Sequence, residues 1–122
     1  MFAGGTVYQA ILSLLSYHRW HGPVSGAVVR AFVQQEPYYG VPFFCQGQCE
    51  SEGYLAAVAT RAIIVIAAGN PLLGLVTFVV VGMVEVRSCE ITCMVRSGQR
   101  VAKGQRTGMF HNGGAGYCLL LR

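Results

Sequence analysis

The chain has 122 residues, enough for one domain with a real hydrophobic core. Apolar residues make up 53% of it and charged residues only 11%, well below the quarter that is typical of soluble domains. This composition argues against a monomer with a wholly polar surface. We expect either an exposed apolar face that supports self-association or docks on a partner, or a chain that is a fragment of a larger fold.

The N-terminal segment, residues 1–16, is the first expected element. One helical face carries Val7, Ile11, Leu14 and Leu15, so the segment allows one short helix. No Lys or Arg precedes His18, and neither a secretory nor a mitochondrial signal is supported. The apolar run from Leu72 to Val86 is shorter than the roughly 20 residues of a membrane-spanning helix and is rich in β-branched residues. We therefore expect an intracellular protein without a transmembrane helix, for which membrane association stays open.

The rest of the chain predicts strands. Pro23–Val33 has the alternation of a strand, and residues 34–53, with two prolines and three glycines, predict a long loop. Residues 61–86 predict two buried strands joined as a hairpin, because Gly69-Asn70-Pro71 interrupts an otherwise continuous apolar run. Glycines 98, 104 and 108 around Val101 suit short strands with tight turns. The predicted fold is mainly β, a single compact core of barrel or sandwich type.

Positive charge gathers in one short stretch near the C-terminus. Nine Lys and Arg residues oppose five acidic ones, all of them Glu. Four of the nine bases lie close together, namely Arg96, Arg100, Lys103 and Arg106. Such a patch could hold phosphates, but a solvated turn is the commoner explanation, and no nucleic-acid partner is expected.

The cysteines form two C-x-x-x-C pairs with one left over. An odd number without a secretory signal argues against a disulfide framework and for a reducing compartment. A zinc site with His18 and His21 is conceivable, but the spacing differs from the usual C-x-x-C knuckle. Buried thiols are the favoured interpretation of Cys45, Cys49, Cys89, Cys93 and Cys118.

The stretch "YHRWHGPVSG", residues 17–26, carries the most chemistry. His18 and His21 lie three residues apart at the expected start of a strand, where either could act as a general acid or base near neutral pH. The pattern alone also fits two histidines that merely satisfy hydrogen bonds at a strand edge.

This stretch, followed by "PYYG", "ATRAIIVI", "GLVTFVVVGMVEV", "GQRVAKGQRTGMFHNGG" and "CLLLR", closely resembles the catalytic C-terminal part of phosphatidylserine decarboxylases. Related pyruvoyl-dependent enzymes, including tryptophan decarboxylase-like relatives, share the resemblance, which runs from about Tyr17 to Arg122. It implies that residues 17–122 form the family's catalytic core. The implied reaction is decarboxylation of phosphatidylserine to phosphatidylethanolamine in phospholipid biosynthesis, or of a free amino acid.

The resemblance also implies site residues. In the family, the serine of a Gly-Ser pair near the C-terminus cleaves its own chain and becomes a pyruvoyl group, the cofactor that withdraws electrons as carbon dioxide leaves. Here Gly113-Gly114 match, but Ala115 occupies the serine position and has no Oγ. By motif position, His21 corresponds to the histidine of self-processing and His18 to the one assigned to decarboxylation.

The family's self-processing histidine is oriented by an upstream aspartate, as in a serine-protease triad. This chain contains no Asp, and the relatives' helical and membrane-docking parts have no counterpart before Tyr17. We therefore expect a catalytic core that is incomplete relative to the family and forms no pyruvoyl group.

Three interpretations stay open. The chain is an inactive remnant of a phosphatidylserine decarboxylase-like enzyme, or a relative acting on amino acids such as tryptophan whose serine was removed by engineering or sequence error. The third is a non-catalytic β-rich binding module, because the glycine spacing around Val101 is similar to lipoyl and biotinyl barrels. Lys103, however, lacks the carrier signature, which ranks this interpretation last.

Overall fold

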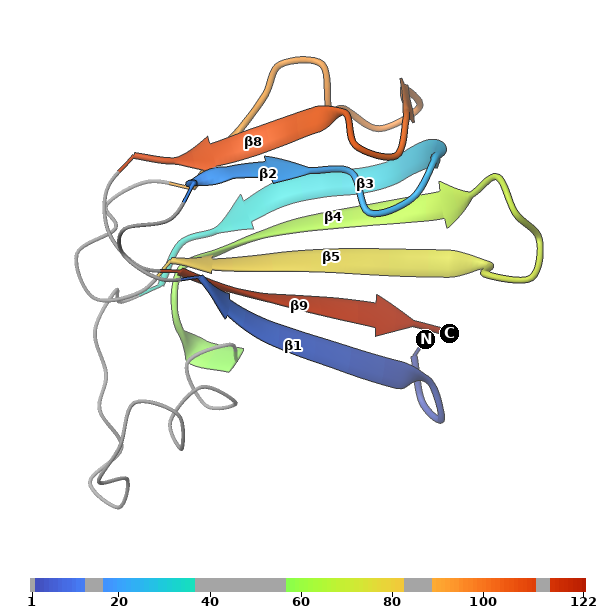
Figure 1. Cartoon of the computed structure of the whole chain (residues 1–122), viewed down its shortest axis with the longest axis horizontal. Coiled ribbons are helices and arrows are strands. Elements are labelled where there is room, and N and C mark those ends of the chain that lie inside the picture. Colours follow the sequence, from blue (N-terminus) through green and yellow to red (C-terminus); the bar gives the residue numbers. More distant parts are fainter. Residues whose placement is uncertain (1, 13–16, 37–56, 83–88, 112–114) are drawn as a thin grey trace.

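The computed structural model describes residues 2–12, 17–36, 57–82, 89–111 and 115–122, which form two antiparallel sheets (Figure 1). Within these ranges, helical geometry is confined to residues 57 and 58. The six-stranded sheet has the order β1 (Thr6–Leu12), β9 (Ala115–Leu121), β5 (Leu75–Gly82), β4 (Arg61–Ala68), β3 (Gly26–Gln34) and β7 (Arg100–Val101). The three-stranded sheet has the order β2 (Arg19–His21), β8 (Arg106–Phe110) and β6 (Cys89–Ile91). The predicted mainly-β core is confirmed.

The hairpin of β4 and β5 is the part of the fold that follows most directly from the sequence. The predicted break at Gly69-Asn70-Pro71 is confirmed, and the side chain of Asn70 caps the turn by accepting a hydrogen bond from the Leu72 N–H at 3.0 Å. Alternation on β4 points Ala62, Ile64 and Ile66 inward, and none of the three is exposed to solvent. These residues therefore anchor the core face of the large sheet.

The N-terminal segment forms a strand over Thr6–Leu12. The prediction of a short helix, drawn from the spacing of its apolar residues, is therefore wrong for these residues. β1 pairs with β9 along its whole length, from Thr6 opposite Leu121 to Leu12 opposite Ala115. The reason is that β9 offers an open edge, and pairing with it satisfies the backbone of a segment rich in β-forming residues. Residues 13–16 lie outside the described ranges, and a boundary at residue 17 stays a prediction.

The exposed apolar side chains expected from the composition occur on this edge strand. Val7 and Ile11 are 63% and 53% exposed, on the face of β1 opposite to Tyr8. Whether they support self-association stays a prediction.

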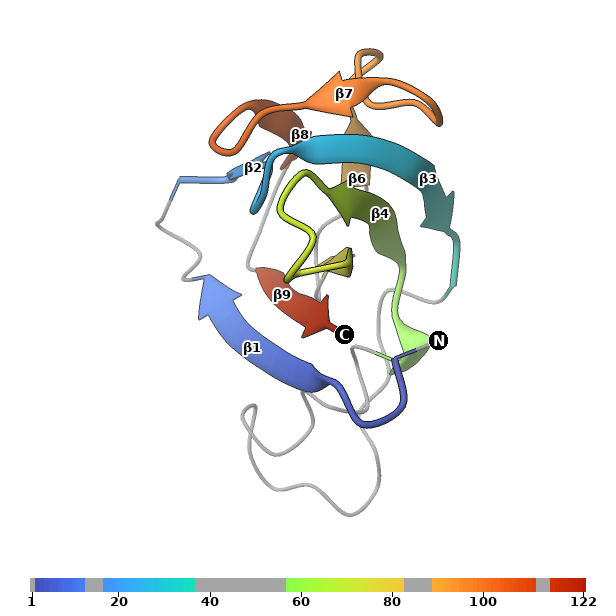
Figure 2. The ribbon, with the colours of Figure 1, turned by 90° about the vertical axis from the view of Figure 1, so that its right-hand side faces the viewer.

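One core joins the two sheets. Figure 2 shows the strands curled around a common interior. Trp20 of β2 and Phe110 of β8 lie with their ring centroids 5.4 Å apart, and they pack in the same cluster as residues of the large sheet. The large-sheet members of that cluster include Val28, Ile64, Ile66, Phe78 and Val80.

The pairing of β2 with β8 contains a bulge. Trp20 lies opposite Gly108, but His21 lies opposite Arg106, so Thr107 is an extra residue in β8. Thr107 is fully buried, and its Oγ1 donates a hydrogen bond to the Trp20 carbonyl oxygen at 3.2 Å. A bulge re-aims the residues beside it, and here the consecutive β8 residues Thr107 and Gly108 are both buried.

Gly108 is required by a close approach. A Cβ at this position would lie 2.5 Å from the Glu90 carbonyl oxygen and 2.5 Å from Cζ3 of Trp20, far inside normal contact distance. The indole of Trp20 therefore packs directly on the backbone of β8.

The cysteines divide by burial. Cys89 and Cys118 are buried as predicted, whereas Cys93 is exposed on the surface turn after β6, so the prediction of a buried thiol is wrong there. Burial raises the pKa of the Cys89 thiol to about 11. Cys45 and Cys49 lie outside the described residues. Among the residues that are described, no group of three metal-binding side chains occurs.

The four bases of the basic stretch, Arg96, Arg100, Lys103 and Arg106, are all exposed, as expected of a solvated stretch. Arg96 and Lys103 lie between strands, whereas Arg100 and Arg106 belong to β7 and β8. No helix within the described ranges is long and apolar enough to cross a membrane.

We predict that Gly108→Ala destabilises the fold by about 1–3 kcal/mol, because the added methyl group forces Trp20 or β6 to move. Gly69→Ala is the matched control, since a Cβ there meets nothing closer than the Ser25 carbonyl oxygen at 3.5 Å. Urea unfolding followed by circular dichroism measures both. Equal stability of the two variants would contradict the close packing of Trp20 on β8.

A second prediction concerns the bulge. Thr107→Val should lower the free energy of unfolding by about 1–3 kcal/mol, because it leaves the Trp20 carbonyl without its hydroxyl donor in a buried place. Thr77→Val is the control, since the Thr77 Oγ1 is buried without a hydrogen-bond partner in the described part of the chain. It should change stability little or raise it. If both variants lost stability equally, the Thr107 hydroxyl would not support the bulge.

Candidate functional site

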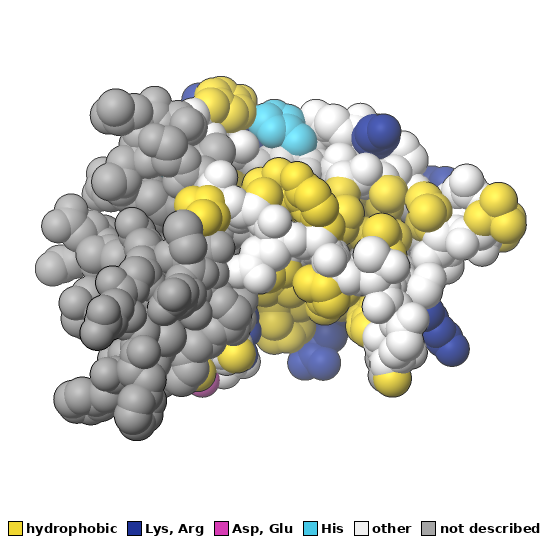
Figure 3. Space-filling view, turned by 60° about the horizontal axis from the view of Figure 1, so that its bottom comes forward, with side chains coloured by type: hydrophobic (Ala, Val, Ile, Leu, Met, Phe, Trp, Pro, Cys, Tyr) yellow, Lys and Arg dark blue, Asp and Glu magenta, His cyan; other side chains and the backbone are white. Residues whose placement is uncertain are grey.

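A cavity of about 530 Å³ lies between the two sheets. Its wall on the large sheet comes from β1, β9 and β5, through Tyr8, Gly116, Tyr117, Leu119, Phe78 and Val80. Its wall on the small sheet comes from β2, β8 and the chain beside β2, through Tyr17, Arg19, Trp20, His21, Pro23 and Phe110. Figure 3 views the molecule from the side of β1, where hydrophobic side chains gather over the middle of the face with a histidine at their border. The volume is in the range of small-molecule sites.

Three consecutive residues of β2 line this cavity, namely Arg19, Trp20 and His21. In a regular strand, neighbours point to opposite faces. Arg19 and His21, two residues apart, share one face of β2, and Trp20 lies between them in the chain. Trp20 is only 5% exposed, and its indole N–H, a hydrogen-bond donor, has no acceptor in the described part of the chain.

His21 lies on the cavity wall beneath an aromatic ring. Its imidazole stacks on Tyr17 with 5.7 Å between ring centroids and 16° between the planes. No carboxylate contacts the imidazole within the described residues, and no Asp or Glu is among the residues that line the cavity. His21 is therefore placed to contact a ligand in the cavity, with the phenol ring of Tyr17 stacked on its imidazole.

His18 is placed differently. It precedes β2, and its carbonyl oxygen accepts a hydrogen bond from the Phe110 N–H at 2.9 Å. Its ring Nε2 is buried without a partner among the described residues, and His18 is not one of the residues that line the cavity. The structure thus brings only the second of the two predicted histidines to the cavity, and the acid and base roles of both stay predictions.

Ala115 opens β9 at the border of the cavity. Its neighbours across the sheet are Leu12 of β1 and Gly82 of β5, and the next residue, Gly116, lines the cavity. The predicted self-cleavage position is therefore at the cavity margin, on the same wall as Tyr117. Gly113 and Gly114 lie outside the described residues.

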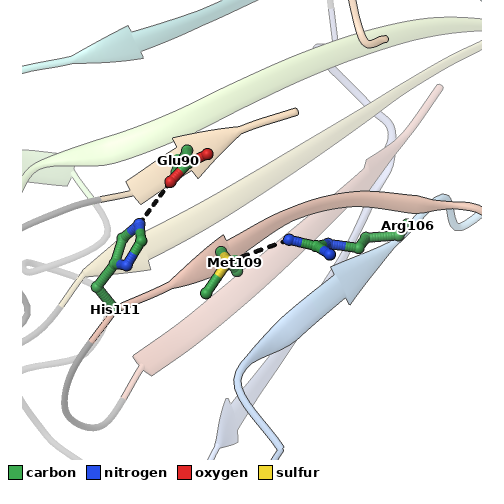
Figure 4. Close-up of polar contacts among 4 residues, drawn as sticks. All are labelled: Glu90, Arg106, Met109 and His111. Carbon is green, nitrogen blue, oxygen red and sulfur yellow. Dashed lines mark hydrogen bonds and ion pairs between the residues drawn. The ribbon is translucent and has the colours of Figure 1, made fainter. Parts of the chain in front are cut away.

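The structure also shows a histidine–carboxylate pair that the sequence did not indicate. His111, just beyond β8, has its Nε2 at 2.5 Å from Oε2 of Glu90 on β6, and both side chains are about half exposed (Figure 4). Glu90 lies opposite Met109, so His111 is its diagonal neighbour on the same face of the sheet. Only the strand register reveals this pair, because 21 residues separate its members along the chain.

The aromatic residues of the cavity were also missed as site residues. Tyr8 and Tyr117 lie with ring centroids 6.4 Å apart, and Tyr117 meets Phe78 edge to face at 5.9 Å. They come from three strands that are distant in the sequence. The spacing of Tyr117 and Leu119, two residues apart on β9, was the one available signal that these side chains share a face.

Comparison with known proteins places these residues in a family. A family model described as "Phosphatidylserine decarboxylase" matches residues 1–121, so the likeness includes the N-terminal strand as well as the core from Tyr17 onward. "Decarboxylase iboD" of Amanita muscaria (strain Koide BX008) is 42% identical over 134 aligned positions, which cover 98% of this chain and 38% of that protein.

Two further similar proteins are named "L-tryptophan decarboxylase". The one from Psilocybe cyanescens is 37% identical and the one from Psilocybe cubensis 36%, and each alignment covers 99% of this chain and 30% of the relative. The chain thus spans about a third of the length of these relatives. The resemblance drawn from the histidine motif and the C-terminal glycines is confirmed, and the chain belongs to the phosphatidylserine decarboxylase family.

Proposed function

We propose that this chain is a member of the phosphatidylserine decarboxylase family that does not process itself, and that it keeps a cavity of the kind used for small amino acids. The observation that carries the proposal is the position of Ala115. It opens β9 immediately before Gly116 of the cavity wall, at the place where the family resemblance requires a serine.

The side chain at this position does not fit the family's cofactor. A pyruvoyl group is made from serine, whose hydroxyl attacks the preceding carbonyl group before the resulting ester eliminates. The methyl side chain of Ala115 provides neither a nucleophile nor an oxygen atom that could leave. We therefore assign no covalent step and no decarboxylation to this chain.

The surroundings of His21 support the same conclusion. A base that activates a hydroxyl is commonly oriented by a carboxylate, as in the serine-protease triad. The chain has no Asp, and within the described residues His21 stacks on Tyr17 and pairs with no carboxylate. Within the described residues, the histidine with a carboxylate partner is His111, which pairs with Glu90.

Two observations favour an amino acid over phosphatidylserine as the class of ligand that suits the cavity. The wall carries aromatic rings of β1, β2, β5, β8 and β9, which suit a flat apolar side chain. Two of the similar proteins are named tryptophan decarboxylases. Phosphatidylserine decarboxylation, the reaction of the family name, is the second candidate.

The first test of this proposal is the integrity of the purified chain. We predict one species of full length, 13.1 kDa, in intact-mass spectrometry after prolonged incubation at neutral pH. The reason is the missing hydroxyl of Ala115. A break between Gly114 and Ala115, with a blocked N-terminus on the C-terminal fragment, would contradict the proposal.

The second test restores the hydroxyl. We predict that Ala115→Ser alone stays uncleaved for hours, because loss of a carboxylate that orients the histidine can cost a factor of about 10⁴ in rate. The same mass measurement provides the readout. Efficient cleavage would show that another group activates the serine, and the double variant Ala115→Ser/Glu90→Gln then tests the His111–Glu90 pair as that group.

A further inference from the structure

Arg19 places a positive charge at the cavity. Among the described residues that line the cavity, Arg19 is permanently cationic and no acidic side chain is present. Arg19 is exposed at the start of β2. A ligand's carboxylate would be attracted to this end of the cavity, whereas an ammonium group would be repelled.

The donors of Arg19 have no partner within the described part of the chain and can meet a ligand. Other arginines of the described chain are engaged, since Arg61 donates to the Ala59 carbonyl and Arg30 lies over the ring of Phe32. No hydrogen bond or ion pair joins the Arg19 guanidinium to any described residue. Its planar fork matches the two oxygens of a carboxylate.

Trp20 contributes an apolar wall to the cavity. The residue is 5% exposed, and the Cε3–Cζ3 edge of its ring packs on Gly108. Its Nε1 lies on the opposite edge of the indole and is fully buried. We therefore assign the carboxylate to Arg19 and not to the indole N–H.

The remaining wall suits an aromatic body. Tyr117 meets Phe78 edge to face, Tyr8 lies beside Tyr117, and Phe110 packs against Trp20. Aromatic rings prefer such tilted and edge contacts, and a flat ring entering between them gains further contacts of the same type.

We propose that the cavity binds small aryl-alkanoic acids without covalent reaction, with Arg19 as the residue that holds the carboxylate. This inference takes the aromatic class of ligand from the proposed function. It does not depend on whether the chain is cleaved. The cavity then discriminates between an aromatic acid and an aromatic amine that lacks the carboxylate, and it favours the acid.

The test uses Trp20, the one tryptophan of the sequence, as the reporter. Its emission, excited where phenyl compounds do not absorb, is titrated with 3-phenylpropanoate, 2-phenylethylamine, L-phenylalanine and inorganic phosphate at low salt. We expect saturable binding of 3-phenylpropanoate, with an affinity at least about tenfold above that of the amine. L-Phenylalanine should bind between the two, because its ammonium group offsets part of the attraction.

Variants identify the anchor. Arg19→Gln should weaken binding of 3-phenylpropanoate by about tenfold or more while leaving binding of the amine unchanged or stronger. Arg19→Lys should retain part of the affinity, because it keeps the charge and loses the fork. Arg100→Gln is the matched control, since Arg100 is an exposed arginine of β7 that does not line the cavity.

Several outcomes would overturn the proposal. They are equal affinity for acid and amine, no effect of Arg19→Gln in a variant with an unchanged circular dichroism spectrum, or no response of Trp20 to any of the compounds. Phosphate binding as tightly as 3-phenylpropanoate would show that the aromatic body contributes nothing. Intact-mass spectrometry of the same sample tests self-processing separately. Failure of the ligand-binding proposal can therefore be distinguished from failure of the proposal that the chain does not cleave itself.

Discussion

The structure depends on how Trp20 is held between its two sheets. The indole lies on the bare backbone of Gly108, its ring meets Phe110, and its carbonyl accepts the hydroxyl of the bulge residue Thr107. These contacts tie the short strand β2 to β8 and bury the largest side chain of the small sheet against the large one. They hold β2 at the cavity, where Arg19 and His21, two residues apart on the strand, share one face.

The opposite wall depends on β9, which lies between β1 and β5. This single strand begins at Ala115 and continues through Gly116, Tyr117 and Leu119 of the cavity wall. In our account, loss of the serine hydroxyl at its first residue removes the family's chemistry and leaves the strand pairing untouched, since backbone hydrogen bonds do not depend on that side chain. A ligand cavity can therefore persist in a chain that forms no cofactor.

Those features that depend on short local patterns could be predicted from the sequence. The hairpin of β4 and β5 follows from β-branched alternation and the turn at Asn70, and the histidine and glycine motifs indicated the family. The N-terminal strand could not be predicted, because Val7 and Ile11, four residues apart, share a face in a helix and in a strand alike. The bulge at Thr107 and the pair of Glu90 with His111 depend on strand register, which no short sequence window contains.

An experimental structure of the chain with 3-phenylpropanoate tests the central claim most directly, because one map reports both the cavity and the backbone at Ala115. The account predicts continuous density from Gly114 to Ala115, the phenyl ring between Trp20 and Tyr117, and the carboxylate within hydrogen-bonding distance of the Arg19 guanidinium. An interrupted chain before residue 115, or a ligand bound elsewhere with its carboxylate away from Arg19, would contradict it.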